Sequence, residues 1–238
     1  MMDDTCAVDI GGTHHLRIIE DLQDNDEDVE KNVGRFVWPT ALPMMKHIRE
    51  DILPSNTEDT IIVELGAGCG LLGMGLAATR KFHQVIITDH DDVWLRRNLD
   101  LNAGILGADV TAMSLDWDDV SEVQAVSDMI GKTCSAIHDP KLLIVASDVL
   151  YNHSSHQKLV HTLRKLSLHG VPTRILIGFL NDRDNDEKLF LSVARVVYGD
   201  TFPSSRSIFV EREGKNSIPK SEELMLDLSE RIDNASSV

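Results

Sequence analysis

Two acidic residues and a glycine-rich turn have the clearest chemical use in this sequence. Glu64 stands just ahead of the turn Gly66-Ala67-Gly68-Cys69-Gly70, and Asp89 follows 23 residues after Gly66. A carboxylate at the mouth of such a turn repels a pyrophosphate but attracts an ammonium or sulfonium group. A carboxylate placed like Asp89 is where a doubly wound sheet meets ribose hydroxyls. Together the two acids favour a ribose-bearing, cationic ligand such as S-adenosylmethionine.

The spacing of the glycines argues against a dinucleotide, which is the other common ligand of such turns. Counting G-x-G-x-x-G from Gly66 places Leu71 at the last position. The literal match through Gly68, Gly70 and Gly73 puts its final glycine inside the helix expected to follow. An NAD-dependent oxidoreductase is therefore disfavoured by both this spacing and Glu64.

Strands that alternate with helices must position these acids. The aliphatic run 61–63 is typical of a buried parallel strand, and a helix over 71–79 would begin with free amide groups aimed at the turn. The alternation predicts a doubly wound α/β fold. We expect further strands at 84–89, 109–115, 142–147 and 173–180, antiparallel strands within 202–211 and 217–228, and helices at 40–53, 91–101, 153–168 and up to about 197. Residues 121–132 are expected to form a helix or an irregular insertion, and 132–140 a loop.

Composition limits the class of partner. The formal net charge of −16 argues against a nucleic-acid backbone and is compatible with basic segments of other proteins, although acidity that only keeps the protein soluble is the simpler explanation. The three cysteines are too few and too far apart for a disulfide framework or a metal set, so no metal is expected. No apolar run approaches the roughly 20 residues of a membrane span, which leads us to expect a location in the cytoplasm or nucleus.

Four ordered motifs resemble one enzyme family. They are G-R-F-V-W-P at 34–39, V-E-L-G-A-G-C-G-L-L-G at 63–73, I-I-T-D-H-D at 86–91 and A-S-D-V-L-Y at 146–151. They resemble the seven-strand S-adenosylmethionine-dependent methyltransferases, and within them the family-16 lysine methyltransferases of the methyltransferase-like-21 type. The resemblance runs from about 34 to 190. It implies a three-layer, Rossmann-like fold with a mostly parallel seven-stranded sheet, and S-adenosylmethionine as the cofactor.

The resemblance also assigns cofactor contacts. Glu64, the loop residues Gly66, Ala67 and Gly68, and Asp89 would bind the cofactor, and Ser147 would add a backbone contact. Trp38 would line the cofactor pocket, and Trp117, which follows the third strand, would approach the adenine. From the residues alone, Trp38 as a core aromatic and Trp117 as a hydrophobic plug stay open.

Asp148 and Tyr151 are the candidates for holding the methyl acceptor. Methyl transfer from a sulfonium is an in-line displacement that needs alignment and a deprotonated acceptor nitrogen, but no metal. We expect Asp148 to orient the amine and Tyr151 to shape a narrow channel. The alternative is that Asp148 caps the following helix while Tyr151 packs over it.

The leading hypothesis is therefore a protein-lysine N-methyltransferase that acts on another protein, such as a translation factor or chaperone, and that works as a monomer. A methyltransferase for small molecules or nucleic acids and a catalytically silent cofactor-binding scaffold are the alternatives. We expect an acidic N-terminal arm over residues 1–33, the methyltransferase domain over 34–228 and a polar C-terminal tail over 229–238.

Overall fold

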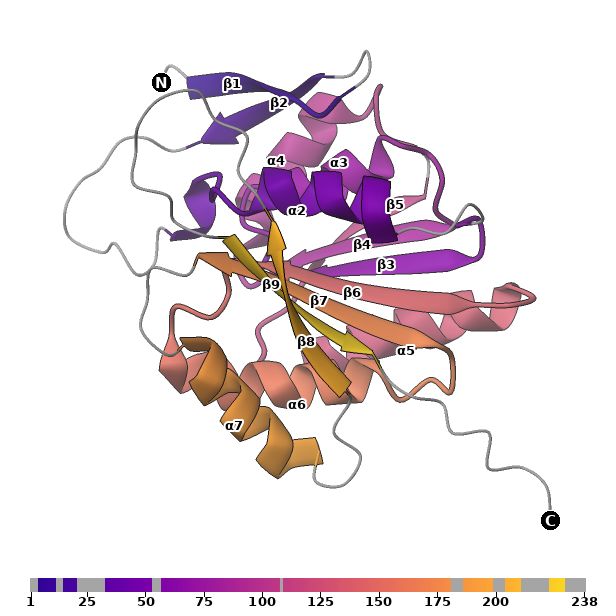
Figure 1. The fold of residues 1–238 in the computed structure, drawn as a ribbon. Coiled ribbons are helices and arrows are strands. Elements are labelled where there is room, and N and C mark those ends of the chain that lie inside the picture. The colour runs from indigo at the N-terminus through magenta and orange to yellow at the C-terminus, as the bar shows by residue number, and fades with distance from the viewer. Residues whose placement is uncertain are drawn as a thin grey trace.

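A seven-stranded sheet forms the centre of the molecule (Figure 1), with strand order β5-β4-β3-β6-β7-β9-β8. The computed structural model describes residues 4–11, 15–20, 33–52, 57–107, 109–180, 186–198, 204–210 and 223–229. The strands are β3 (Thr60–Leu65), β4 (Gln84–Asp89), β5 (Val110–Ser114), β6 (Lys141–Ser147), β7 (Thr173–Leu180), β8 (Ser204–Val210) and β9 (Glu223–Ser229). The first five are parallel, whereas β9 runs antiparallel between β7 and β8. The predicted mostly parallel, seven-stranded fold is confirmed.

Helices cover both faces of this sheet and complete the three predicted layers (Figure 1). One face carries α2 (Ala41–His47), α3 (Leu71–Ala77) and α4 (Asp92–Asn102), and the other carries α5 (Val120–Ala136), α6 (His156–Leu166) and α7 (Asp186–Tyr198). Side chains of a strand alternate between faces, so Val63 and Leu65 join the core under α5 and α6 while Ile62 joins the core under α3. The same alternation turns Glu64 toward α3.

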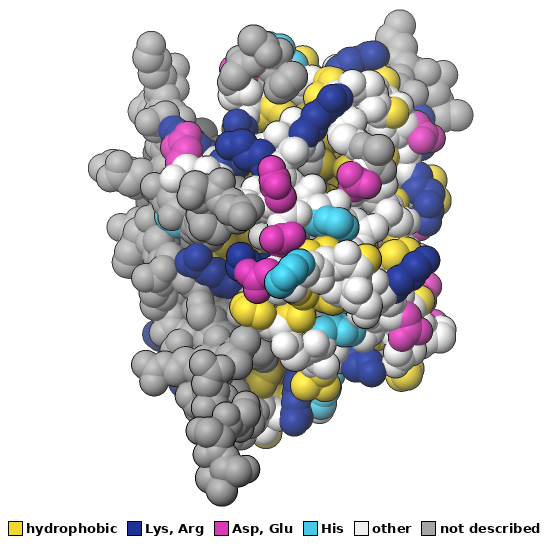
Figure 2. Space-filling model, turned by 90° about the vertical axis from the view of Figure 1, so that its right-hand side faces the viewer, with side chains coloured by type: hydrophobic (Ala, Val, Ile, Leu, Met, Phe, Trp, Pro, Cys, Tyr) yellow, Lys and Arg dark blue, Asp and Glu magenta, His cyan; other side chains and the backbone are white. Residues whose placement is uncertain are grey.

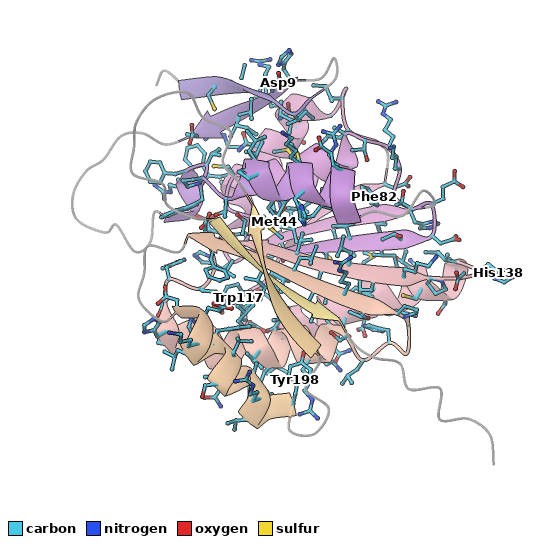
Figure 3. All side chains as sticks on the ribbon, viewed as in Figure 1. Asp9, Met44, Phe82, Trp117, His138 and Tyr198 are labelled. Carbon is cyan, nitrogen blue, oxygen red and sulfur yellow. The ribbon has the colours of Figure 1, made fainter. Side chains whose placement is uncertain are left out.

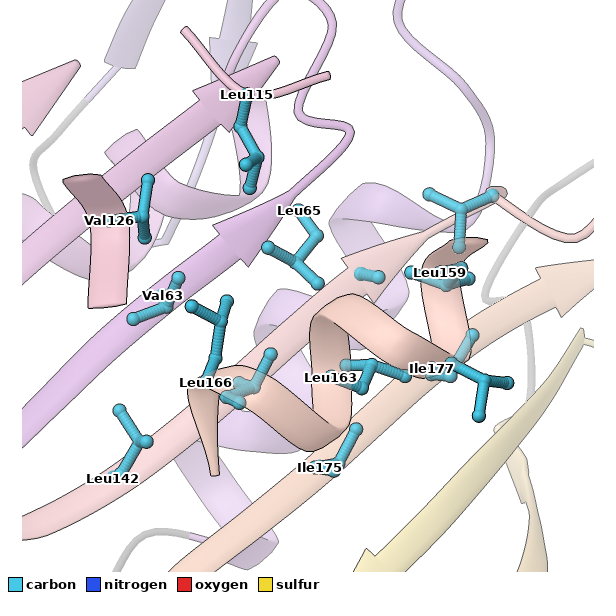
Figure 4. Close-up of a cluster of buried hydrophobic side chains, with 14 of the residues drawn as sticks. Val63, Leu65, Leu115, Val126, Leu142, Leu159, Leu163, Leu166, Ile175 and Ile177 are labelled. Carbon is cyan, nitrogen blue, oxygen red and sulfur yellow. The ribbon is translucent and has the colours of Figure 1, made fainter. Parts of the chain in front are cut away.

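The core under α6 shows the helical period clearly. Leu159, Leu163 and Leu166 of α6 are at most 1 % exposed, and they face Val63 and Leu65 of β3 (Figure 4). Spacings of four and three residues place them on one side of the helix. This packing fixes the position of α6, whose first turn follows the segment 148–152 that carries two candidate site residues.

Helix α5 is longer than the sequence led us to expect. It continues to Ala136, so the loop predicted for 132–140 is wrong for its first residues. Val126, Ile130 and Cys134 are all buried, and they continue one apolar stripe at intervals of four residues. The Thr133 hydroxyl also donates to the Met129 carbonyl within the helix. Tertiary packing therefore carries the helix past the point where its polar residues suggested an end.

A two-stranded hairpin, β1 (Asp4–Asp9) and β2 (His15–Glu20), packs against α4 through two buried asparagines. The Asn98 side chain accepts from the Ile19 N–H at 2.7 Å and donates to the carbonyls of Ile19 and Cys69. The Asn102 side chain accepts from the Arg17 N–H and donates to the Arg17 carbonyl. Asn98 thus links the hairpin to the glycine-rich loop. The acidic segment 21–30 and the tail after 229 lie outside the described residues, and the domain boundaries stay a prediction.

Replacing Asn98 by Ala should lower the free energy of unfolding by about 2–3 kcal/mol, since it leaves buried backbone groups of Ile19 and Cys69 without their partner. Urea titration measures the change. Asp100→Ala, at an exposed position of the same helix, is the control and should stay within about 0.5 kcal/mol of the wild type. Equal stability of both variants would contradict the bridging role of Asn98.

The two ends of the parallel strands differ in character. Figure 2 shows the end at which the parallel strands begin, which Phe82 and His138 mark in Figure 3. Basic, acidic and histidine side chains are interspersed over this end. Trp117 lies toward the opposite end (Figure 3).

Within the described parts of the chain, no helix has both the length and the apolar character needed to cross a bilayer.

Candidate active site

A cleft of about 270 Å³ opens where the parallel strands end. Its floor and walls come from the residues that follow β3, β4, β5 and β6, as expected for an open α/β sheet. Every residue predicted for the site lines this cleft: Trp38, Glu64, Gly66, Ala67, Gly68, Asp89, Trp117, Ser147, Asp148 and Tyr151. The structure thus brings together segments that are more than 100 residues apart in the sequence.

The glycine-rich loop needs its glycines for conformation and for space. Gly66, Gly68 and Gly70 have φ of +61°, +53° and +80°, which is the left-handed region. A Cβ on Gly68 would lie 2.9 Å from the Gly34 carbonyl oxygen, so the G-x-x-V-W-P segment rests directly on the loop. The Ala67 N–H donates to the Thr88 carbonyl at 3.0 Å and ties the loop to β4.

Gly68→Ala is expected to weaken cofactor binding and to lower the free energy of unfolding by about 2–4 kcal/mol, because the new methyl group meets Gly34 and the backbone is strained. Thermal unfolding and calorimetry measure the two effects. Gly104→Ala is the matched control, since no atom lies within 4 Å of a Cβ there. A Gly68 variant as stable as the Gly104 variant would contradict the close packing.

Glu64 is buried at the cleft floor and is 2 % exposed. Its Oε2 accepts the Gly73 N–H of α3 at 2.8 Å. Burial raises the pKa of Glu64 to about 8, against the opposing effect of the Gly73 N–H, and Asp89 raises it further. The carboxyl is therefore largely protonated at neutral pH until a cation enters the cleft and favours its ionised form.

Asp89 is buried and binds the backbone of the glycine-rich loop. Its Oδ2 accepts the Gly68 N–H at 2.8 Å, and its Oδ1 accepts the Asp91 N–H at 3.0 Å. The His90 Nδ1 also lies 3.0 Å from Oδ1, and this hydrogen bond raises the pKa of His90. His90 lines the cleft beside Asp89, so it belongs to the site, although no motif or spacing in the sequence pointed to it.

Asp148 occupies a strained position between β6 and α6. Its φ is +57°, which is uncommon for a residue with a side chain, and its N–H donates to the Gly178 carbonyl at 2.8 Å. Its Oδ2 accepts the Thr40 N–H at 3.2 Å and the Thr40 hydroxyl, and lies 3.4 Å from the Ser147 hydroxyl. The carboxylate therefore holds the start of α2. The helical segment that follows has Asn152 as its N-cap, and the Asn152 side chain accepts the Ser154 N–H.

Three aromatic side chains shape the cleft. The rings of Trp38 and Tyr151 are nearly parallel, with centroids 6.4 Å apart and an interplanar angle of 6°, and Tyr151 is 41 % exposed. The Trp117 indole lies over Gly66, where a Cβ would be 3.3 Å from it. The Trp117 Nε1 is buried and has no hydrogen-bond partner among the described residues. An unpaired donor beside the cleft fits a ligand that carries acceptor atoms.

Sequence reasoning missed several residues that build the walls. Gly34 touches the loop, and the Val37 N–H donates to the Glu20 carboxylate at 2.7 Å, which fixes the segment that carries Trp38. Thr40 holds Asp148. Gly34 and Val37 belong to the G-x-x-V-W-P motif and Thr40 follows it directly, so the motif was the available signal, but their partners lie far away in the sequence.

The donor set suits an organic cation better than a metal ion. Two buried carboxylates lie beside a loop without side chains at its glycines, which leaves room for a ligand with an ammonium and hydroxyl groups. In the part of the chain that the structure describes, no three His, Cys, Asp or Glu side chains gather as a metal site would require.

Comparison with known proteins gives consistent matches. Residues 19–196 match the lysine methyltransferase family. The chain is 29 % identical over 152 residues to the protein N-terminal and lysine N-methyltransferase EFM7 of Yarrowia lipolytica, covering 58 % of this chain and 54 % of that protein. It is 30 % identical over 135 residues to calmodulin-lysine N-methyltransferase of Arabidopsis thaliana, covering 54 % and 39 %. The chain thus spans about half the length or less of these curated relatives.

Among solved structures, the methyltransferase domain of bacterial CtHen1 superposes with a TM-score of 0.54 at 13 % identity, covering 79 % of this chain and 97 % of that domain. At this identity the likeness concerns the fold alone.

Proposed function

Since the chain belongs to the lysine methyltransferase family, we propose that it transfers a methyl group from S-adenosylmethionine to a lysine side chain of another protein. The observation that carries the proposal is the cleft itself. It combines a buried carboxylate floor, Glu64 and Asp89, with Asp148 and Tyr151 at the neighbouring wall. The floor suits a cationic, ribose-bearing cofactor, and the wall suits an amine.

On the cofactor side of the cleft, residues of the chain would bind and orient S-adenosylmethionine. The ionised Glu64 would face the ammonium or sulfonium charge, Asp89 would bind the ribose hydroxyls, and Trp117 would stack on the adenine. The glycine-rich loop admits the cofactor because Gly66 and Gly68 carry no side chain. When bound, S-adenosylmethionine supplies the methyl group and leaves as a neutral thioether.

On the acceptor side, Asp148 and the two parallel aromatic rings position the lysine. The Asp148 carboxylate accepts a hydrogen bond from the amine and favours the orientation in which the nitrogen lone pair meets the methyl carbon in line. Trp38 and Tyr151 flank the amine and restrict its position, while Tyr151, which is 41 % exposed, leaves the site open to solvent. The ammonium loses its proton to solvent before attack, since only the neutral amine has a lone pair.

A transfer assay with labelled S-adenosylmethionine tests this proposal. The wild type and Asp148→Ala are incubated with an extract that lacks the protein, and labelled products are resolved by mass spectrometry. We expect one or a few proteins labelled on lysine by the wild type alone. Label on a small molecule or on nucleic acid would contradict the proposal and support a methyltransferase for that acceptor. Cofactor binding without any labelled product would favour a catalytically silent scaffold.

A protein N-terminal amine is a second candidate acceptor, because the matched EFM7 relatives are named for both N-terminal and lysine methylation. Both amines are cations that Asp148 could orient in the same way. Once an acceptor protein is identified, a form of it with an acetylated N-terminus distinguishes the two. Acetylation blocks an N-terminal acceptor and leaves the lysines reactive.

A translation factor or a chaperone is the proposed class of acceptor, and the enzyme is proposed to act as a monomer in the cytoplasm or nucleus. The net charge of −16 supports an acceptor lysine that lies within a basic segment. Transfer that weakens as salt is raised would support this electrostatic preference, and size-exclusion chromatography with light scattering tests the monomer.

A further inference from the structure

His156 is buried beside the turn that carries the two candidate catalytic residues. It is the first residue of α6, and its side chain is completely inaccessible. Its Nε2 lies 2.9 Å from the carbonyl oxygen of Leu150, which stands between Asp148 and Tyr151. Because a carbonyl oxygen only accepts, Nε2 carries the proton of the ring. The imidazole therefore holds the middle of the turn by one buried hydrogen bond.

The surroundings keep this imidazole neutral. Its Nδ1 is buried and has no hydrogen-bond partner among the described residues. Burial lowers the pKa of His156, and His153, whose ring centroid is 5.2 Å away, lowers it further, while the Leu150 carbonyl and Asp186 oppose the change. The Phe190 ring of α7 meets His156 edge-on at 5.7 Å. The neutral ring therefore keeps its single proton on Nε2, which donates it to the Leu150 carbonyl.

A second contact supports the same segment from α7. The His153 Nε2 lies 2.5 Å from Oδ1 of Asp186, whose side chain is mostly buried at the start of α7. Helices α6 and α7 pack side by side (Figure 1). Asp148 itself sits at a φ of +57°, a conformation that persists only where neighbouring structure enforces it. Both histidine contacts lie within eight residues of Asp148, at the start of the helices that follow it.

We propose that His156 is a positioning residue for methyl transfer: its Nε2–H holds the Leu150 carbonyl and so fixes Asp148 and Tyr151 for the acceptor amine. The inference rests on the proposed function, because it assigns these two residues to the acceptor. We expect its effect mainly on the acceptor side of the cleft, although Val149 of the same turn also packs against Gly66 of the glycine-rich loop. Cofactor affinity is set by Glu64, Asp89 and the glycine-rich loop, none of which His156 holds.

Two substitutions of similar polarity test the inference. In His156→Gln the amide can place a donor where Nε2 stood, whereas in His156→Asn the amide is one methylene too short to reach Leu150. We expect Asn to lower kcat by about tenfold or more, with the Kd for S-adenosylmethionine unchanged within about twofold, and Gln to restore most of the rate. His161→Asn, at an exposed position of the same helix, is the control and should behave like the wild type.

Hydrogen exchange of the amides in residues 148–152 gives a readout that does not depend on activity. His156→Asn should speed this exchange, and His156→Gln should not. If the Asn variant keeps both the wild-type kcat and the wild-type exchange, or if Gln is as impaired as Asn, the positioning role is overturned. If the wild type itself transfers no methyl group, the proposed function fails, while the exchange data still decide whether His156 holds the turn.

Discussion

Asp148→Asn should lower kcat for methyl transfer by about a thousandfold while leaving the affinity for S-adenosylmethionine nearly unchanged. Asparagine keeps the size of the side chain and an acceptor oxygen for Thr40, but it loses the negative charge that orients the acceptor amine. Single-turnover kinetics with a purified acceptor protein measures the chemical step, and calorimetry measures cofactor affinity.

The contact between Asp148 and Thr40 supplies the control for this prediction. Thr40→Val removes the hydroxyl that donates to Asp148 but keeps the carboxylate charge and the Thr40 N–H. If Asp148 served only to hold the start of α2, Asp148→Asn would lose no more activity than Thr40→Val, because asparagine keeps an acceptor oxygen for Thr40. We expect Thr40→Val to cost less than about tenfold in kcat. Comparable losses in both variants would therefore assign Asp148 a structural role.

Glu64→Gln should stabilise the cofactor-free protein at high pH by roughly 5 kcal/mol and leave it unchanged near pH 4.5. In the wild type the folded carboxyl keeps its proton up to a pKa of about 8, whereas the unfolded one loses it at its usual value of 4.5. The stabilising contribution of protonation is therefore complete below pH 4.5 and is lost as the pH rises through 8. Glutamine accepts the Gly73 N–H without ionising, so its stability should lack this dependence. Urea unfolding at pH 5 and pH 9 makes the comparison.

The same substitution should weaken binding of S-adenosylmethionine by about tenfold to a hundredfold, because the cation loses its charged partner. Binding to the wild type at pH 7 should release close to one proton, since the cation favours the ionised carboxylate. Calorimetry in two buffers of different ionisation enthalpy counts these protons. If the wild type released none and bound no tighter than Glu64→Gln, then Glu64 would not face the cation.

The sequence carried enough information to predict the sheet and the membership of the cleft. Local period places Val63 and Glu64 on opposite faces of β3, and residues that follow parallel strands must meet at one edge of the sheet. That rule brought Asp89 and Asp148 together before any contact was known. Trp38 depended instead on a motif, and Trp117 on its place after the third strand in the resembled family. Neither periodicity nor composition says what a loop tryptophan faces.

What could not be predicted are the partners of the site residues. Thr40 reaches Asp148 across 108 positions of sequence, and Asn98 reaches Ile19 across 79. No local pattern encodes such pairs, since they arise from how separate layers pack. The raised pKa of Glu64 also arises from packing between layers, because burial of its carboxyl beside α3 is the main cause. The sequence shows that a carboxyl is present but not how deeply it is buried. His156 looks like any helical histidine until the fold places Leu150 beside it.

The position of β9 has a consequence for how the chain is made. This strand follows β8 along the chain, yet it lies between β7 and β8 and pairs with both. As a nascent chain leaves the ribosome, β7 emerges with an open edge, and β8 has no neighbour to join until β9 follows. The apolar edge strand is exposed for that interval, which is the situation that chaperones guard against. Completion of the sheet therefore waits for β9, although the cleft is built from strands that emerge earlier.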